Sequence, residues 1–400
     1  AEEAGRHHCR LRCHVLGVCG VSADALAEWL EQHALGMQTG DGGLQAGGSE
    51  ALAQALVSLP GLRDADLLVC SHPVSLCFLA FMVLWQPRGA ELAPLPMLVH
   101  LSSTLLYGAP GCTVCSGGLR NYESPEALRY MQSSRELLTG QLSLVALAEG
   151  AVLSAQLKLQ LGVTVPSCPA LALYLDSNTY LDGMQKRSTI LVTRARLFNH
   201  PAGFFMRCML SEFAITNGPV ADATRGHFWF AEAVGGSSGS EDTWKSWTEM
   251  STCKAAFFIP SDIHQRTFIE LYRMLIPMFM PNAEWFLRLP LIAPFGTFAY
   301  NGSLPAEDQS LDTAMDSAQH GVPFSFDPNS ATARAVFHWY HYSDYAHFPH
   351  VSRCNSIPDL LGQLSTTDFE AVSHNMQSHY ALLARGATAA FARALTALIP

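Results

Sequence analysis

The sequence predicts an α/β fold in which two lobes with parallel sheets face a central cleft. Three observations lead to this prediction. The chain has 400 residues, more than one hydrophobic core normally supports. Hydrophobic residues make up 49% of it and charged residues only 14%, which supplies enough apolar side chains for buried strands and helices. Short apolar runs alternate with helical periodicities, and this alternation starts again near Pro166.

The first lobe is expected over residues 1–165. Its short, continuous apolar runs are typical of buried parallel strands. Between these runs apolar residues recur at helical spacing, as Leu26, Trp29 and Leu30 do behind the N-cap Ser22. The expected strands are 14–20, 66–70 and 97–100, and the expected helices are 22–33, 50–59, 74–85 and 137–151.

The second lobe is expected over residues 166–370. Its expected strands are 170–174, 189–193, 227–233 and 255–259, and its expected helices are 204–214 and 244–253. Several prolines interrupt residues 282–330, for which the pattern predicts a turn-rich insertion and no further structure. The aromatic tract 337–348 is expected to pack in the core, and 368–398 is expected to form two amphipathic helices.

Composition restricts the partners. The formal charge of -10, without any Lys/Arg cluster longer than two residues, excludes nucleic acid as the main partner. The longest apolar run, Val74–Trp85, is far shorter than the roughly 20 residues that span a bilayer, so no transmembrane segment is expected. The start Ala1-Glu2-Glu3 predicts that any targeting segment is absent or removed. Localisation stays open between the secretory pathway, which the acceptor triplet at Asn301 favours, and the cytoplasm.

Cysteine and histidine patterns predict no metal site. The chain has eleven cysteines, an odd number too sparse for a dense disulfide framework. Cys112 and Cys115 form a CxxC pair without a second pair at zinc-finger spacing, so a disulfide or two inert thiols is the better interpretation. A second cluster near the N-terminus is interpreted as adventitious; it consists of His7, His8, Cys9, Cys13 and His14.

The most informative stretch is 255–281. An apolar strand-like run stops at Pro260-Ser261-Asp262, and a helical periodicity follows until a second apolar run begins at Pro277. Asp262 and Glu270 therefore stand at the two ends of a strand-to-helix connection, with seven residues between them.

This layout resembles the donor-site signature of GT-B glycosyltransferases, which have two Rossmann-like lobes. The matching residues are Pro260, Ser261, Asp262, Glu270 and Pro277. The resemblance implies that Glu270 binds the ribose hydroxyls of a nucleotide sugar and that Ser261 and Asp262 lie against the sugar and phosphates. It also implies a C-terminal segment, 371–400, that packs back on the first lobe. The nucleotide sugar would be a substrate, with no separate cofactor and no metal.

The chain departs from this signature in three places. Asp262 replaces the usual glutamate, Leu271 the usual alanine, and the loop holds the bulky run His264-Gln265-Arg266. The segment Glu-Leu-Tyr-Arg-Met-x-Ile-Pro also resembles poorly characterised eukaryotic proteins of the same superfamily. That resemblance would not define a substrate.

Binding a nucleotide diphosphate requires positive charge or a helix N-terminus near the phosphates. Arg194 and Arg196 follow the expected strand 189–193 and are the candidates, although solvated surface charges are an equally good interpretation. His264, beside Asp262, is a further candidate for a donor contact.

An inverting transfer also needs a general base. His72 is the first candidate and His100 the second, because each closes an apolar strand of the first lobe. A structural hydrogen-bonding role is the alternative for both. A retaining enzyme needs no such base.

The sequence therefore predicts a metal-independent glycosyltransferase that uses a nucleotide-activated sugar and an acceptor glycan, protein or lipid. Two alternatives remain open. One is a GT-B scaffold without catalysis, whose bulky loop fills the donor pocket. The other is an unrelated α/β enzyme with Cys70 or Cys77 as a nucleophile beside His72.

Overall fold

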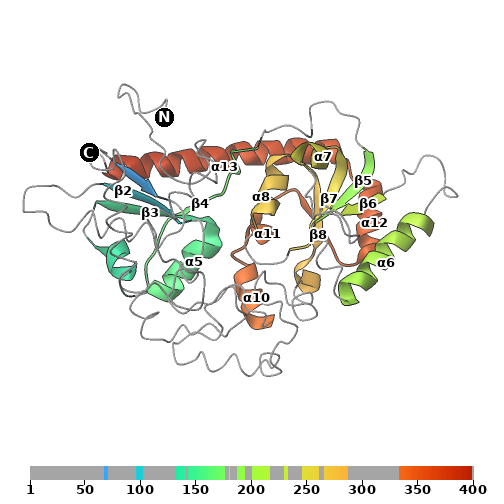
Figure 1. Ribbon diagram of the computed structural model, residues 1–400, viewed down its shortest axis with the longest axis horizontal. Coiled ribbons are helices and arrows are strands. Elements are labelled where there is room, and N and C mark those ends of the chain that lie inside the picture. Colours follow the sequence, from blue (N-terminus) through green and yellow to red (C-terminus); the bar gives the residue numbers. More distant parts are fainter. Residues whose placement is uncertain are drawn as a thin grey trace, which may run out of the picture.

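The computed structural model consists, in its described part, of two parallel sheets with helices packed against them. The expected α/β class is confirmed at this level. In Figure 1 the first sheet lies on the left, the second on the right, and one long helix runs along both. The described residues are 67–70, 96–101, 132, 134–140, 143–175, 180, 187–193, 201–216, 229–232, 246–260, 265–286 and 333–398.

The first sheet has four parallel strands in chain order: β1 (Leu68–Cys70), β2 (Met97–Leu101), β3 (Leu144–Glu149) and β4 (Ser167–Cys168). Alternate residues point to opposite faces, and both faces are covered. Val99 packs toward helix α5 (Gly150–Leu161), whereas Leu98 and Leu147 pack toward the long C-terminal helix. This explains why the strands are continuous apolar runs.

The helix expected over 137–151 is wrong. Residues 134–139 are helical, but β3 follows and pairs with β2 along its whole length, from Met97 opposite Leu144 to Leu101 opposite Ala148. The run Leu144–Glu149 is apolar enough for either structure, and pairing with β2 decides for strand. Helix α5 begins immediately afterwards at Gly150, whose φ of 82° explains the glycine.

The strand expected over 170–174 is also wrong. The strand is β4, three residues earlier, and residues 172–175 form a turn in which the Leu175 N–H donates to the Ala172 carbonyl at 3.0 Å. Because β4 pairs with β3, the first sheet extends past the expected lobe boundary at 165/166. The described part of the second sheet begins at Arg187.

The second sheet contains five described parallel strands in the order β6-β5-β7-β8-β9. They are β5 (Arg187–Val192), β6 (Trp229–Glu232), β7 (Cys253–Phe257), β8 (Met278–Pro281) and β9 (Val351–Cys354). The expected strands at 189–193, 227–233 and 255–259 are confirmed within a few residues, whereas β9 was not predicted. The chain passes from β6 back across β5 to β7, so the strand order reverses between β5 and β7. Ligands of open α/β sheets bind outside the carboxyl ends of the strands at such a reversal.

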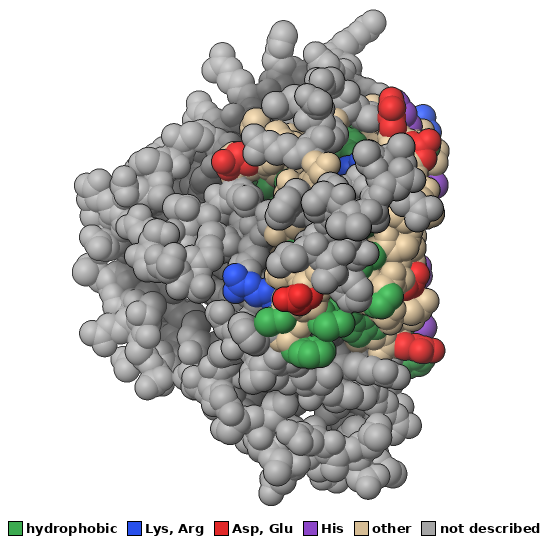
Figure 2. Space-filling view, turned by 90° about the vertical axis from the view of Figure 1, so that its right-hand side faces the viewer, with side chains coloured by type: hydrophobic (Ala, Val, Ile, Leu, Met, Phe, Trp, Pro, Cys, Tyr) green, Lys and Arg blue, Asp and Glu red, His purple; other side chains and the backbone are tan. Residues whose placement is uncertain are grey.

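In the described residues, the strands from β5 to β8 are connected by α6 (Pro201–Thr216), α7 (Trp247–Ser251) and α8 (Arg266–Arg273). α6 packs on the sheet through Met206 and Leu210 and leaves Phe205 66% exposed. Figure 2 views the end of the molecule on which α6 lies, where apolar side chains gather beside acidic and basic ones. α7 begins with a capping box between Ser246 and Glu249, which fixes its N-terminus.

The aromatic tract packs in the core in part: Trp339, Tyr340, Tyr345 and Phe348 are buried, whereas Phe337 and Tyr342 are exposed. It covers α10 (Ala333–Tyr340) and α11 (Asp344–His347). The Phe268 ring on α8 meets Tyr345 and Phe348 edge to face, with centroid distances of 5.1 and 5.4 Å. Such contacts add to the burial energy of the rings and hold α8 in a defined orientation.

The chain ends in α12 (Ile357–Thr366) and α13 (Phe369–Leu398). The expectation of two helices over 368–398 is wrong, because α13 is continuous. Its sequence is rich in alanine and contains no proline, so nothing interrupts the hydrogen-bond ladder. Met376 and Tyr380 pack in the core of the second sheet, while Ala387 and Leu398 pack on the first. α13 therefore connects the two sheets.

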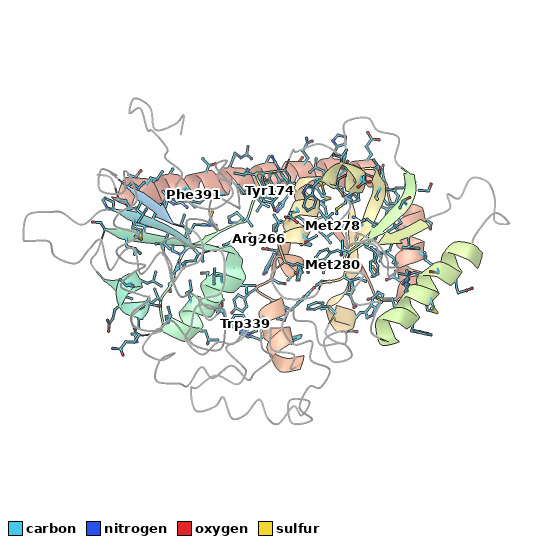
Figure 3. The ribbon with its side chains drawn as sticks, in the orientation of Figure 1. Tyr174, Arg266, Met278, Met280, Trp339 and Phe391 are labelled. Carbon is cyan, nitrogen blue, oxygen red and sulfur yellow. The ribbon has the colours of Figure 1, made fainter. Side chains whose placement is uncertain are left out.

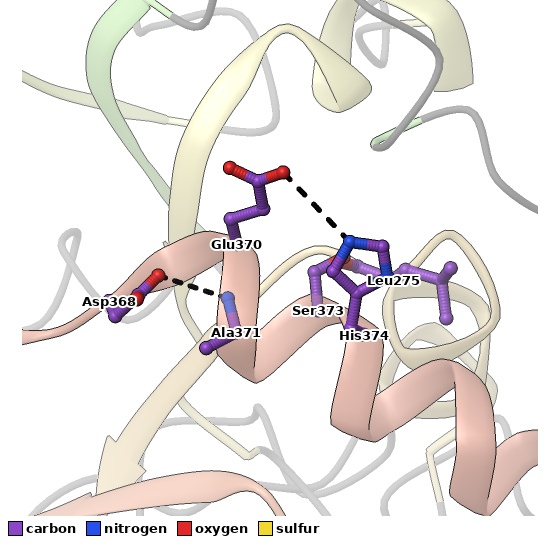
Figure 4. A network of polar contacts seen from close by, with 6 residues as sticks. All are labelled: Leu275, Asp368, Glu370, Ala371, Ser373 and His374. Carbon is purple, nitrogen blue, oxygen red and sulfur yellow. Dashed lines mark hydrogen bonds and ion pairs between the residues drawn. The ribbon is translucent and has the colours of Figure 1, made fainter.

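The N-terminal half of α13 is fixed to the end of α8 (Figure 4). The Ser373 hydroxyl donates to the Leu275 carbonyl at 2.8 Å, and the Asp368 carboxylate accepts from the Ala371 N–H at 3.0 Å. Leu275 has a φ of 65°, and the Ile276 N–H donates to the Leu271 carbonyl at 3.2 Å. This is a Schellman ending with leucine at the left-handed position. Through Ser373, α13 thus binds the strained turn at Leu275.

α13 is, within the described residues, the one helix that is long and apolar enough to cross a membrane by length and composition. Its buried residues, however, form a stripe that packs on both sheets. The opposite face exposes His374, Arg385 and Arg393. The described part of the chain accordingly contains no clear transmembrane segment.

Candidate interlobe site

The two sheets meet at Glu149 and Arg266. Glu149 ends β3 of the first sheet, and Arg266 opens α8, which follows β7 of the second. Arg266 Nη2 lies 3.7 Å from Glu149 Oε2. The Glu149 side chain is only 7% exposed and that of Arg266 is 61% exposed. A buried carboxylate of one sheet therefore faces a solvent-accessible cation of the other.

Glu270 lies one helical turn after Arg266 and is 9% exposed. Its Oε1 accepts a hydrogen bond from the Tyr174 hydroxyl. Tyr174 belongs to the turn after β4 and is 67% exposed, so this contact also links the first sheet to α8. Figure 3 shows Tyr174 and Arg266 in the region between the two sheets. Burial raises the pKa of Glu270, while the Tyr174 hydrogen bond and the charge of Arg266 oppose that rise.

The charge of the Glu149 carboxyl group can change near neutral pH. Burial raises its pKa to about 7, with Arg266 lowering it and Asp344 on α11 raising it further. Burial raises the pKa of Asp344 to about 6, and His347 opposes this rise. Two carboxyl groups with raised pKa, Glu149 and Glu270, thus lie near Arg266, and a third, Asp344, acts on Glu149. Strongly shifted groups of this kind are typical of functional sites.

His100 lies in β2 opposite Leu147 of β3 and is half-buried. Its ring packs on Phe391 of α13, with centroids 5.7 Å apart. Burial, and secondarily the charge of Arg266, lowers the pKa of His100, so the imidazole is neutral at pH 7. The structure thus places the second base candidate, His100, on the face of the sheet that α13 covers. The charge of Arg266 acts on its imidazole from a distance.

The other candidates from the sequence lie outside the described residues. Two of them follow segments that are hydrogen-bonded to each other at the ends of β5 and β7. Arg194 follows Thr193 in the chain, and Ser261 follows Pro260. The Thr193 N–H donates to the Phe257 carbonyl at 3.1 Å, and its hydroxyl accepts from the Ile259 N–H at 3.2 Å. The candidates outside are His72, Arg194, Arg196, Ser261, Asp262 and His264, together with Cys77, Asn301 and the side chain of Cys70.

Sequence reasoning missed Glu149 and Tyr174 and treated Arg266 only as a bulky loop residue. A signal for Glu149 exists, because an acidic residue between an apolar run and Gly150 is typical of the end of a parallel strand. The expectation of a helix there concealed it. Tyr174 had no local signal, since its partner Glu270 lies 96 positions along the chain.

The described residues contain no group of three or more His, Cys, Asp or Glu side chains that could hold a metal ion. In comparisons with protein-family models, curated proteins and solved structures, nothing matches this chain. The chemistry of the site therefore has to be inferred from its geometry.

Proposed function

We propose that this protein is a GT-B glycosyltransferase, which transfers a sugar from a nucleotide-activated donor to an acceptor without a metal ion. The observation that carries the proposal is the cluster of Glu149, Arg266 and Glu270 where two parallel sheets meet. Both sides of the cluster come from the carboxyl ends of strands, directly in β3 and through the β7-to-α8 connection in the second sheet. Sites of α/β sheets are built at this edge.

In this proposal Glu270 binds the ribose of the donor. Its carboxylate is buried and already accepts a hydrogen bond from a hydroxyl group, that of Tyr174. A ribose hydroxyl is a donor of the same kind, and a buried carboxylate gains more from such a bond than an exposed one. Ser261 and Asp262 would contact the donor sugar or phosphate, as the resemblance implies, with His264 as a further donor contact.

The diphosphate requires cations. Arg266 stands at the N-terminus of α8, where the helix dipole also favours negative charge. Arg194 or Arg196, two and four residues after the end of β5 in the sequence, would add to it. These groups would stabilise the negative charge that develops on the leaving diphosphate.

If the transfer inverts configuration, His72 or His100 would take the proton of the acceptor hydroxyl. The lowered pKa of His100 supports this role in one respect, because a neutral imidazole can accept a proton at pH 7. Its position under α13 would require the acceptor to reach that face of β2.

Nucleotide binding tests the proposal. Thermal unfolding and calorimetry would be measured with UDP, GDP, ADP and CMP, each alone and with an attached sugar. We expect saturable stabilisation by one nucleotide, and loss of it in Glu270→Gln. Glu370→Gln is the matched control, because Glu370 is an exposed carboxylate on α13. The proposal fails if no nucleotide stabilises the wild-type protein.

A scaffold without catalysis is the second candidate. The observation in its favour is the Tyr174 hydrogen bond, which occupies an oxygen of Glu270 that a ribose would need. Tyr174→Phe separates the two functions. In a transferase it should leave nucleotide binding intact or tighten it, whereas in a scaffold it should bring no nucleotide binding; the loss of stability from the missing hydrogen bond is the same in both.

A further inference from the structure

Arg266 is the shared cation of the interlobe site. Its charge lowers the pKa of four groups from separate places in the fold: His100, Glu149, Tyr174 and Glu270. The Arg266 side chain is the more exposed partner of the ion pair, so it can change direction without disturbing the core. Glu149, in contrast, is held at the end of a paired strand. A movable cation beside a fixed buried carboxylate can be taken by a stronger anion.

The position of Arg266 specifies what such an anion would be. α8, which is described along its whole length, carries no acidic residue in its first turn, so the positive end of its dipole and Arg266 act on the same region. Arginine and a helix N-terminus together suit a phosphate group, which accepts several hydrogen bonds at once. A diphosphate carries more charge than the single carboxylate of Glu149.

We infer that Arg266 changes partner when the diphosphate of a nucleotide sugar binds: it leaves Glu149 for the phosphate oxygens, and Glu149 takes up one proton from the solvent. This inference rests on the proposed function for the identity of the ligand. No covalent bond forms or breaks. The proton comes from water or buffer and is held on a carboxylate oxygen of Glu149, which can then donate a hydrogen bond toward the phosphate instead of repelling it.

The sign of the proton exchange follows from the groups around Glu149. Burial and the negative charge of Asp344 on α11 raise its pKa, and Arg266 opposes both. When Arg266 turns away and a diphosphate arrives, the loss of the arginine charge and the negative charge of the phosphates both act in the raising direction. The pKa of Glu149 then rises above about 7, so binding takes up protons at pH 7 to 8 and weakens as the pH rises.

Among the described residues, the other titratable groups near Glu149 do not reverse this. Burial raises the pKa of the Cys168 thiol on β4 and of the Tyr174 phenol, so both are neutral at pH 7. His100 on β2 is neutral as well, because burial lowers its pKa. Glu270 on α8 has a raised pKa and adds at most negative charge, and His347 acts on Asp344.

The first test measures protons directly. Calorimetry of the full chain with inorganic pyrophosphate, in Tris and in HEPES at pH 7.5, gives the protons taken up from the difference in observed heats. We expect wild type to take up more protons than Glu149→Gln, whose residue 149 cannot titrate. The difference should be less than one proton per site. Since pyrophosphate binds protons itself, the difference between the two proteins is the decisive quantity. Equal uptake by both overturns the inference, as does the absence of pyrophosphate binding.

Affinity supplies the second test. Glu149→Gln removes the competing carboxylate and should tighten pyrophosphate binding at pH 8 by roughly two- to fivefold, the effect of an ion pair with one solvent-exposed partner. Arg266→Ala should weaken it at least about tenfold. Glu370→Gln and Arg385→Ala, both exposed on α13, are the controls and should change nothing. Weaker binding by Glu149→Gln overturns the exchange.

The outcome separates the inference from the proposed function. In one outcome, pyrophosphate shows the exchange while UDP, GDP, ADP and CMP bind no more tightly than pyrophosphate and keep their affinity in Glu270→Gln. In that case the exchange stands and the transferase proposal fails. If one nucleotide binds through Glu270 without excess proton uptake over Glu149→Gln, the exchange fails and the transferase proposal stands. Should Glu149→Gln not fold, Glu149→Ala, which also cannot titrate at this position, takes its place as the reference, and equal proton uptake by it and wild type from pH 6.5 to 8.5 overturns the inference.

Discussion

The two sides of the interlobe site hold buried carboxylates in different ways. On the α8 side, Glu270 accepts a hydrogen bond from the neutral hydroxyl of Tyr174. On the β3 side, Glu149 faces the charge of an exposed arginine at 3.7 Å. A neutral donor leaves the net charge of the carboxylate unchanged, whereas a cation makes its protonation depend on where that cation points. The difference suggests hydroxyl recognition on one side and charge-dependent binding on the other.

The packing beneath the two carboxylates differs as well. α8 rests on an aromatic cluster in which Phe268 contacts Phe258, Tyr345 and Phe348. Glu149 stands at the end of β3, where a two-residue partner strand, β4, pairs with it. The orientation of Glu270 thus depends on a large core, and that of Glu149 on a short stretch of sheet.

The largest effect is expected for Phe268→Ala. Its ring is fully buried in the aromatic cluster, so truncation leaves a cavity and should cost about 3–5 kcal/mol of unfolding free energy. Urea unfolding measures this. Phe205→Ala, on an exposed position of α6, is the control and should stay within about 0.5 kcal/mol. A small loss in Phe268→Ala would mean that α8 is not held by this cluster.

Glu149→Gln should change how stability depends on pH. The pKa of Glu149 rises from 4.5 to about 7 on folding, so the native state holds its proton more tightly, and wild type loses stability as the pH rises through this window. The loss is at most about 3 kcal/mol. The variant should match wild type at pH 4 and exceed it at pH 8, as measured by urea unfolding across that range. A constant difference at every pH would show that Glu149 does not titrate there.

Tyr174→Phe should affect the other side of the site. Glu270 then loses a hydrogen bond to its charged form, which costs about 1–3 kcal/mol at pH 8. The same loss raises the pKa of Glu270 further, because that bond opposes the effect of burial. Carbon-13 NMR titration of the carboxyl groups measures this shift. An unchanged titration of Glu270 would show that the hydroxyl does not bind it in solution.

The smallest effect is expected for Ser373→Ala on α13, whose hydroxyl contacts the turn after the C-terminus of α8. The variant loses the hydrogen bond to the Leu275 carbonyl, for a cost of about 1 kcal/mol. Ser378→Ala is the matched control, since that hydroxyl bonds only within α13, to the His374 carbonyl, on the exposed face. If both variants are equally stable, the end of α8 does not depend on α13.

The sequence by itself determined the elements around Glu270. Residues 255–281 combine an apolar run, a break and a helical periodicity, and each of these is a local property that burial on one face dictates. β7, α8 and β8 therefore lie close to where the pattern predicted them. The burial of Trp339, Tyr340, Tyr345 and Phe348 was likewise predicted, because large apolar side chains are usually buried, but the exposure of Phe337 and Tyr342 was not.

The tertiary structure alone decided the first-sheet side of the site. Leu144–Glu149 is compatible with helix or strand, and only its pairing with β2 makes it a strand that presents Glu149 to Arg266. The same holds for Tyr174, whose role depends on a partner 96 positions away, and for α13, whose single stripe of buried residues packs on both sheets. Periodicity determines which face of an element is buried, but contacts distant in sequence determine what that face meets.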